Sequence, residues 1–292
     1  MKNIRELETV ARYGSKTKNR VMGAVIILVL LACTVVMLTP VAIMLTTSLK
    51  AGNEIFISPP RWIPEKPLFS NYTEIFTKLN YLMFFRNSLF VAVCVVIGTM
   101  ISSSLVAYGF FRYRARGKKL LFMIVISTLM IPYPTLMIPQ YILFNKLDWV
   151  ESYLPLIVPT FFGSAYMIFL LRQFFSSISN ELFDAARIDG CGEFRCYWNI
   201  ALPLSKTALA VVAIFSFLWN WDDLLAPVIY LGSVPEKSTL PVMLSSLTAK
   251  YRLPPWNLLM AAATVSALPC IALFVFCQRY FVEGIVTTGI KG

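Results

Sequence analysis

The sequence predicts an all-α protein that crosses a membrane six times and keeps both termini in the cytoplasm. Two observations support this fold class. Hydrophobic residues make up 58% of the 292 residues and charged residues only 14%, whereas soluble domains carry about 25% charged residues. The apolar residues also fall into long blocks, and the basic residues gather in alternate segments between these blocks. Both features are typical of a polytopic membrane protein.

Six apolar blocks are long enough to cross a hydrocarbon core of about 30 Å, which takes about 20 helical residues. They cover residues 21–46, 87–111, 120–144, 154–171, 207–231 and 258–282. In lipid, every backbone donor and acceptor must be paired within its own segment, so we expect each block to be helical. The first block is too long for a signal peptide and no cleavage site follows it, so we expect a permanent anchor.

The orientation follows from the basic residues. Most of the 26 Lys and Arg residues lie in residues 1–20, in the loops after the second and fourth blocks, and in the C-terminal tail. Cytoplasmic flanks of transmembrane helices carry an excess of Lys and Arg. The chain is therefore expected to comprise a cytoplasmic N-terminal segment (1–20), a six-span transmembrane domain (21–282) with a cytoplasmic loop at 176–206, and a cytoplasmic C-terminal tail (283–292).

Composition excludes several kinds of chemistry. The chain contains no His, which rules out Ser-His and Cys-His nucleophile pairs and His-ligated metals. Its six Cys residues show no C-x-x-C spacing, and we interpret them as small hydrophobic residues. The basic residues that give the net charge of +11 lie in the segments between the apolar blocks. This distribution argues against a nucleic-acid partner. We therefore predict no catalytic residue and no metal site.

Prolines interrupt the third block at Pro132, Pro134 and Pro139. Proline breaks or kinks a membrane helix, and the freed carbonyl groups must then face protein or a water-filled path. A packing kink is an equally good interpretation at this point.

The loop at 176–206 has the pattern of two short helices. Ser179 or Asn180 can cap the first helix. The acidic residues expected in its first turn, Glu181 and Asp184, would interact favourably with the helix dipole. Gly190 is placed to end this helix in a left-handed conformation. The loop is therefore expected to form a compact helix-turn-helix.

Each short helix is expected to present one distinctive face. On the first helix this face holds Leu182, Ala185, Ala186 and Asp189. On the second it holds Phe194, Tyr197, Trp198 and Ala201, and Pro203 is expected to end the helix. Paired alanines allow close approach of another surface, and aromatic residues are frequent anchors at interfaces. The alternative is a helix that lies on lipid headgroups.

The spacing in this loop resembles the EAA motif of bacterial ABC importer permeases. The matching residues are Asp184-Ala185-Ala186, Gly190, Ile200 and Leu202-Pro203. The resemblance covers nearly the whole chain and is to the sugar-importer branch, in particular to the smaller permease of the maltose type. Other matching segments are Asn87-Ser88-Leu89, Ala107-Tyr108-Gly109-Phe110 with Arg112 and Gly117, Met130-Ile131-Pro132, Trp219-Asn220 with Asp222 and Pro227, Thr239-Leu240, Gln278-Arg279 and Lys291-Gly292.

The resemblance implies that the loop forms a coupling helix that sits in a cleft of a cytoplasmic ATPase. The ATPase-coupling residues on this basis are Glu181, Asp184, Ala185, Ala186, Asp189, Gly190 and Pro203. There are two departures from the family pattern. Asp184 stands at the position of the usual Glu, and Ser179 and Asn180 stand where a proline is usual. Neither removes the acid or the turn glycine, so we expect docking to be kept.

The resemblance also implies a heteromeric complex in the inner (plasma) membrane of a bacterial cell. Its other members would be a second homologous permease, two copies of the ATPase and an extracytoplasmic solute-binding protein. The chain itself lacks a Walker A phosphate loop, so we expect no enzyme and no cofactor in it, with ATP and Mg²⁺ bound by the partner ATPase. This subunit would form half of the translocation path for a carbohydrate, with an oligosaccharide favoured.

The fifth block contains the candidate residues of that path, which are Trp219, Asn220, Trp221, Asp222 and Asp223. Two acids inside a span cost several kcal/mol each unless they face water or a partner. An aromatic ring beside a carboxylate could stack on a sugar and hydrogen-bond to it. An interfacial aromatic belt with snorkelling acids, or a helix-capping pair, would explain the same residues.

The main alternative function is an ion- or proton-coupled secondary transporter of a polar solute. Such a carrier would place ionisable residues deep in several spans and would show internal repeats. The sequence places ionisable residues deep in one span and has no clear repeat. An intramembrane enzyme is disfavoured because the chain lacks His and any convincing acid pair beside a nucleophile.

Overall fold

Helices make up the regular structure of the described part of the chain. The computed structural model describes the backbone of residues 2–250 and 254–289 and the side chains of residues 22–249 and 254–278. Within these ranges there are helices of the α, 3-10 and π types and no β-strand. The all-α prediction is therefore confirmed. Lys291 and Gly292, which belong to the matched segments, lie outside the described residues.

The chain divides into two compact units, and the first consists of Met1–Thr73 and Trp256–Thr264. Its main element is α1 (Lys2–Ser48), followed by the short η1 (Gly52–Glu54) and a proline-rich segment. The side-chain amide of Asn71 donates to the carbonyl oxygens of Ser48 and Lys50 at 2.8 and 3.0 Å. These bonds tie the far end of the proline-rich segment back to the end of α1.

The second unit consists of Glu74–Pro255 and Val265–Gly292 and carries the elements that matter for function. Helices α2 (Ser70–Lys78) and α14 (Trp256–Gly289) contribute to both units. The other elements of the second unit are α3 (Tyr81–Arg112), α4 (Lys118–Ser127), η2 (Thr128–Met130), α5 (Tyr133–Lys146), α6 (Leu154–Ile157), η3 (Val158–Phe162), α7 (Ala165–Phe175), α8 (Asn180–Ile188), α9 (Glu193–Cys196), η4 (Tyr197–Ala201), α10 (Leu202–Leu204), α11 (Lys206–Trp221), α12 (Leu225–Leu231), η5 (Pro235–Lys237) and α13 (Leu240–Lys250).

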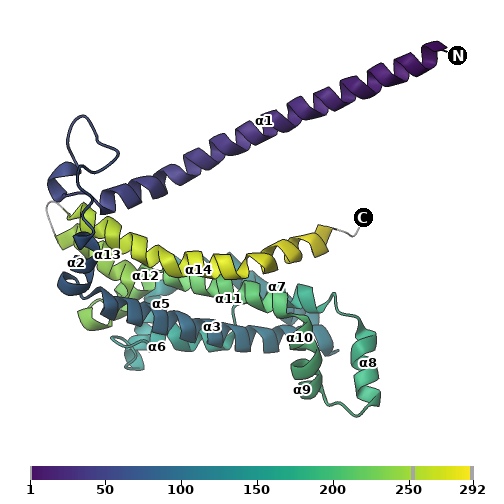
Figure 1. The fold of residues 1–292 in the computed structure, drawn as a ribbon. Coiled ribbons are helices and arrows are strands. Elements are labelled where there is room, and N and C mark those ends of the chain that lie inside the picture. The colour runs from purple at the N-terminus through teal and green to yellow at the C-terminus, as the bar shows by residue number, and fades with distance from the viewer. Residues whose placement is uncertain (1, 251–253, 290–292) are drawn as a thin grey trace. The chain divides into compact units, whose positions relative to one another are not determined.

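Helix α3 is the central element of the second unit. It packs along α7 and α11, and these three helices run side by side in Figure 1. Close approach to η3 requires a glycine, because a Cβ at Gly98 would lie 2.5 Å from Oγ1 of Thr160. One turn along α3, the hydroxyl of Ser102 donates to the carbonyl oxygen of Thr160 at 2.8 Å. This contact fixes η3 against the middle of α3.

The candidate spans follow the predicted blocks with two changes. Four helical stretches are long and apolar enough to cross a membrane, and they match the first, second, fourth and sixth blocks: Met22–Ser48, Tyr81–Arg112, Leu154–Phe175 and Trp256–Gln278. Two further pairs of helices qualify only as bent pairs. They are Lys118–Met130 with Tyr133–Lys146, bent by 99°, and Glu193–Leu204 with Lys206–Trp221, bent by 79°. The described residues therefore contain four candidate spans, or up to six if each bent pair is one span.

The third and fifth blocks are not the continuous helices that the sequence predicted. The third block breaks after η2, where Pro132 adopts an extended conformation (ψ 134°) before α5 begins. This confirms that proline interrupts the block, and a bend of 99° is more than a packing kink. In the fifth block α11 ends at Trp221 and α12 begins at Leu225. Apolar composition does not report such breaks, because a broken helix and a straight one can have the same residues.

Candidate functional site

The loop predicted at 176–206 folds into two short helical limbs, which we call the elbow (residues 180–204). The first limb is α8, and the second runs through α9, η4 and α10. Figure 1 shows both limbs beyond the adjacent ends of α3 and α11. The predicted helix-turn-helix is thus confirmed.

Local capping explains where the first limb begins and ends. Oγ of Ser179 accepts a hydrogen bond from the backbone N–H of Glu181 at 3.2 Å, which makes Ser179 the cap. At the other end Gly190 has φ +78°, and the N–H of Cys191 donates to the carbonyl of Ala186 at 2.8 Å. This is the left-handed C-terminal cap that the sequence predicts. Asp184 is in the second turn rather than the first, because the helix begins at Asn180.

The turn at Gly190 gives a sharp prediction. An added Cβ would meet nothing within 4 Å, so substitutions act only through the backbone. Gly190→Val should strain the turn by about 1–2 kcal/mol, so hydrogen exchange of residues 180–190 should become about tenfold faster. Gly190→Asn is the matched control, because Asn tolerates a positive φ. Equal exchange rates in the two variants would show that the left-handed turn is not needed.

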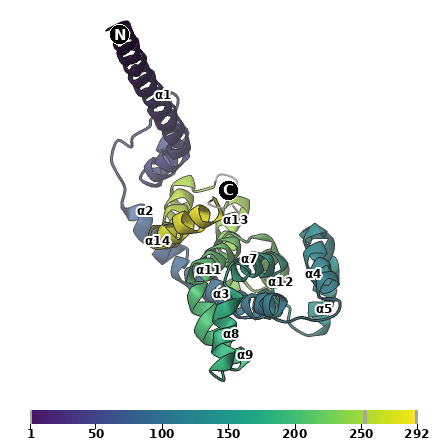
Figure 2. The same cartoon turned by 90° about the vertical axis from the view of Figure 1, so that its right-hand side faces the viewer.

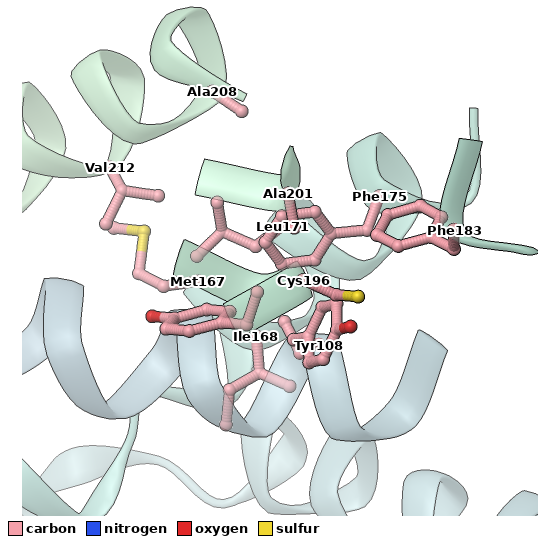
Figure 3. Packing of buried hydrophobic residues seen from close by; sticks show 12 residues of the cluster. Tyr108, Met167, Ile168, Leu171, Phe175, Phe183, Cys196, Ala201, Ala208 and Val212 are labelled. Atoms are coloured by element: carbon pink, nitrogen blue, oxygen red, sulfur yellow. The ribbon is translucent and has the colours of Figure 1, made fainter. Parts of the chain in front are cut away.

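The side chain of Phe183 anchors the first limb to the bundle. It is fully buried and lies in a cluster with residues of α3, α7 and the second limb. Its ring meets that of Phe111 at a centroid distance of 5.6 Å, and the guanidinium of Arg112 lies 5.0 Å above it. Figure 3 shows Phe183 beside Phe175 and near Tyr108. Residues 107–112 at the end of α3 therefore form a platform for the elbow.

A charge network joins the two limbs of the elbow to the end of α3. The side chain of Arg112 is only 7% exposed, and its Nη2 lies 3.2 Å from a carboxylate oxygen of Asp184 on the first limb. Its Nε lies 3.5 Å from a carboxylate oxygen of Glu193 on the second limb. Glu193 also pairs with Arg187 and accepts a hydrogen bond from the Tyr108 hydroxyl at 3.1 Å. We call these residues the Arg112 network.

The network keeps Glu193 ionised. Burial by itself would raise the pKa of the Glu193 carboxyl, but the hydrogen bonds from Arg187 and Tyr108 and the charges of Arg187 and Arg112 hold that pKa below its ordinary value. A carboxyl with a lowered pKa stabilises the fold above its ordinary pKa, and this contribution is lost as the pH falls through the lowered value. At neutral pH the network is therefore intact.

The second limb differs from its prediction. Tyr197 and Ala201 are buried as one face, but Phe194 and Trp198 are 72% and 62% exposed. The physical reason is a tertiary contact: the hydroxyl of Tyr197 lies 2.7 Å from that of Ser104 on α3, which gives the tyrosine a buried partner. Two large aromatic side chains are therefore left uncovered on the elbow.

Pro203 does not end the second limb as predicted. The π-helical turn η4 precedes it, with the N–H of Leu202 bonded to the carbonyl of Tyr197. This wider turn accommodates the proline in the short α10, and the chain bends only at Ser205, before α11 begins. Pro203 is exposed at the end of the limb.

Most of the predicted coupling residues lie on the exposed side of α8. The exposed members are Glu181, Asp184, Ala185 and Asp189, together with Leu182 and Ile188. Ala186 is half-buried and packs against the cluster that holds Phe183. The surface that the elbow leaves open thus combines apolar side chains with acidic ones.

Sequence reasoning missed the residues that hold the elbow. Phe183 was not singled out. Arg112 was interpreted as a cytoplasmic basic residue and as part of a segment that matches the family, with no role in holding the elbow. A signal did exist for Arg112: it sits at the end of an apolar span, where a long basic side chain can fold back on aromatic neighbours. Its acidic partners could not be identified, since Asp184 is 72 residues away in the sequence.

A separate cavity of about 260 Å³ lies beside α3, between its neighbours η3, α7 and α11. Its lining residues are Val95, Thr99, Thr160, Ser164, Met167, Ser216, Trp219, Asn220 and Asp223. Three of the five predicted path residues are therefore brought together with hydroxyl groups from other helices. The Trp219 ring is 54% exposed and stacks on Phe215 at a centroid distance of 5.7 Å.

The other two predicted path residues do not line this cavity. Trp221 is buried, and its indole N–H donates to the carbonyl of Ser266 at 3.0 Å. Asp222 is exposed. Asp223 also stabilises the start of α12, because one carboxylate oxygen accepts hydrogen bonds from the N–H groups of Leu225 and Ala226 at 3.0 and 3.3 Å. The helix-capping interpretation thus holds for Asp223, although this residue also lines the cavity.

Comparison with known proteins identifies the family. The family model described as "Binding-protein-dependent transport system inner membrane component" matches residues 95–286. The arabinooligosaccharides transport system permease protein AraQ of Halalkalibacterium halodurans is 35% identical over 78% of this chain and 81% of its own length. The sn-glycerol-3-phosphate transport system permease protein UgpE of Yersinia enterocolitica is 31% identical over 80% of this chain and 85% of its own length.

A solved structure shares the fold. A chain of a bacterial ABC transporter involved in the import of the acidic polysaccharide alginate aligns with a TM-score of 0.79 and 23% identity, over 90% of this chain and 98% of its own length. The family match spans most of the chain, including the elbow and the cavity lining, and the fold is that of a multi-pass membrane permease. The chain therefore belongs to the family of binding-protein-dependent transport system inner membrane components.

Proposed function

We propose that this chain is one of two homologous permease subunits of an ATP-driven importer and that its elbow docks on a cytoplasmic ATPase. The observation that carries the proposal is the elbow itself. Phe183 and Arg112 fix it to α3, while Leu182, Ala185 and Trp198 remain exposed. Small and aromatic side chains on a rigid support suit a protein partner. An external solute-binding protein delivers the substrate in this proposal, in keeping with the family's description.

The membrane arrangement in this proposal has six spans, with both termini in the cytoplasm of a bacterial cell. In this arrangement the pair Lys118–Met130 and Tyr133–Lys146 counts as one span, and α11 with α12 counts as another. The elbow lies on the cytoplasmic side of the inner (plasma) membrane. The basic residues support this orientation, because Arg114, Arg116 and Lys119 lie in the loop and the first turn of α4 that follow Arg112 at the end of α3 on which the elbow rests. Residues 1–20 and 283–292 are the cytoplasmic ends.

Helix α3 provides the mechanical connection in the proposed mechanism. Its cytoplasmic end holds the elbow through Ser104, Tyr108 and Arg112. Further along the same helix, Val95 and Thr99 line the cavity. ATP and Mg²⁺ bind to the partner ATPase, and this chain hydrolyses nothing. When the ATPase subunits close, the elbow moves with them, and α3 carries the movement to the cavity as a rigid element.

The chemistry of the cavity favours a neutral carbohydrate. Four hydroxyl side chains, the Asn220 amide, the Asp223 carboxylate and the Trp219 ring line it, and none of the lining residues is Lys or Arg. Hydroxyl and amide groups hydrogen-bond to sugar hydroxyls, and the ring can stack on a sugar face. An anion such as glycerol phosphate would meet a carboxylate without a compensating cation. An oligosaccharide, as in the name of the AraQ relative, is therefore the favoured substrate.

Two adjacent acids allow a matched test of this path. Asp223→Asn keeps the oxygen that caps α12 but removes the charge, and we expect transport to fall about fivefold, since a hydrogen bond to a charged group is stronger by about 1 kcal/mol than one to a neutral group. Asp222→Asn, outside the cavity, should leave uptake unchanged. Uptake of labelled oligosaccharide into proteoliposomes measures both. Equal effects of the two exchanges would contradict the assignment of the cavity.

Isolation of the native complex distinguishes the proposed importer subunit from an ion- or proton-coupled secondary transporter. The tagged chain should bring down an ATPase and a second permease, and uptake should require ATP and the external binding protein. An ion- or proton-coupled carrier would purify alone, and its uptake would stop when the ion gradient is collapsed. Gradient-dependent uptake by the isolated chain would overturn the proposed function.

A further inference from the structure

A basic concavity lies at the junction of α3 and α4. It has a volume of about 600 Å³ and is lined by six consecutive residues, Arg114, Ala115, Arg116, Gly117, Lys118 and Lys119. Gly117 turns the chain here with φ +81°. Four cationic side chains are thus gathered around one hollow within a single tight turn. Neither the Arg112 network nor the cavity beside α11 includes any of them.

These cations are not neutralised by the side chains that the structure describes. Each of the ion pairs among the described side chains involves other residues. Lys118 instead donates to the carbonyl oxygens of Phe111 and Tyr113 at 3.3 and 2.8 Å, which folds the loop back on the end of α3. The charges of Arg114 and Arg172 both act on Lys118. A concentration of like charges of this kind attracts an anion.

An apolar surface continues directly from the basic concavity. The first turns of α4 expose Leu120, Leu121, Met123 and Ile124, each by more than half of its side chain. Phe122, between these residues, is half-buried and packs against the core. The guanidinium of Arg172 lies 4.1 Å above its ring, and the Nε of Arg172 is buried without a hydrogen-bond partner. A ligand that fits both parts has a negatively charged head and a hydrocarbon tail. A free inorganic anion would use only the basic part.

We propose that this concavity binds the phosphate headgroup of an anionic phospholipid, with the acyl chains of the lipid along α4. Arg114, Arg116 and Lys119 bind the headgroup, while Lys118 keeps the loop folded. Clusters of basic residues beside a transmembrane helix recognise anionic headgroups in this way. The lipid then stabilises the loop that follows Arg112, so that occupancy of this site supports the end of α3 on which the elbow rests.

Native mass spectrometry of the whole complex, extracted from vesicles of equal parts phosphatidylglycerol and phosphatidylcholine, tests this proposal. The triple variant R114Q/R116Q/K119Q removes the binding charges and keeps Lys118. The control variant K66Q/R86Q/K146Q removes the same charge from exposed side chains that form none of the ion pairs described above. The wild-type complex should retain phosphatidylglycerol in preference to phosphatidylcholine. The triple variant should lose this preference by about thirtyfold, and the control should keep it.

Several results would overturn the lipid site. These are full retention of phosphatidylglycerol by the triple variant, and equal losses in the triple and control variants. Inorganic phosphate added at matched ionic strength should not displace the lipid; displacement would assign the concavity to free phosphate instead. If the triple variant does not assemble, the single exchanges Arg114→Gln and Arg116→Gln test the site instead. Each should lower the preference for phosphatidylglycerol by about threefold, and an unchanged preference would contradict the proposal. None of these results depends on the ATPase docking proposed above.

Discussion

Replacing Phe183 by alanine is expected to destabilise the elbow by about 3–5 kcal/mol, the range typical of a buried phenylalanine that is cut back to alanine. The ring is fully buried, lies between Phe111 and Arg112, and has no route to collapse without moving α8. The assembled transporter should then lose ATPase stimulation and uptake together. Hydrogen exchange of residues 180–190 measures the local loss of stability directly.

The neighbouring residue provides the control for Phe183. Leu182 is 49% exposed, so Leu182→Ala should change local exchange by less than about 1 kcal/mol. If Leu182 touches the ATPase, its replacement weakens docking without loosening the elbow. The two variants thus distinguish a residue that holds the elbow in place from a residue that contacts the partner. Unchanged exchange protection in Phe183→Ala would contradict the anchoring role.

Replacing Arg112 by glutamine is expected to uncouple the elbow while leaving the hydrophobic cluster in place. The ion pairs with Glu193 and Asp184 would be lost, and removing one partner of a buried charge pair costs about 2 kcal/mol or more. Asp184 adds little because its side chain is 62% exposed. A loss of about 2 kcal/mol corresponds to about thirtyfold in the population of the fixed elbow. ATPase stimulation by the loaded binding protein, measured in proteoliposomes, should fall to a similar extent.

Two further variants isolate the geometry of Arg112. Arg112→Lys keeps the charge but cannot form the forked contact with both limbs, so it should recover only part of the coupling. Arg187→Gln removes the same charge from a side chain that is 52% exposed and reaches only Glu193, so its effect should be several times smaller. Equal effects of Arg187→Gln and Arg112→Gln would contradict the bridging role of Arg112.

The spans were predictable because their signal is summed over many residues. Transfer of 20 apolar residues into lipid dominates any local preference, and the first, second, fourth and sixth blocks appear as helical stretches. The breaks at Pro132 and at Asp222 were harder to predict. A hydropathy sum does not depend on the order of residues within a block, whereas the 99° bend depends on two extended residues, Ile131 and Pro132.

The candidate site shows the same division between local and distant causes. The roles of Ser179 and Gly190 follow from hydrogen bonds between residues two to five positions apart, so sequence spacing was sufficient. The exposure of Phe194 and Trp198 was not predictable, because it depends on Tyr197 meeting Ser104 across 93 residues. The Arg112 network depends on contacts of the same kind. Only the fold could reveal which side of each limb is covered.

A cross-link from the exposed face of α8 tests the central claim most directly. In a variant that lacks the six native cysteines, Ala185→Cys places a single thiol on this face. In the purified complex the thiol should cross-link to a cytoplasmic ATPase subunit, and in intact cells an impermeant maleimide should not label it. Labelling from outside the cell, with no cross-link to any ATPase, would contradict the account.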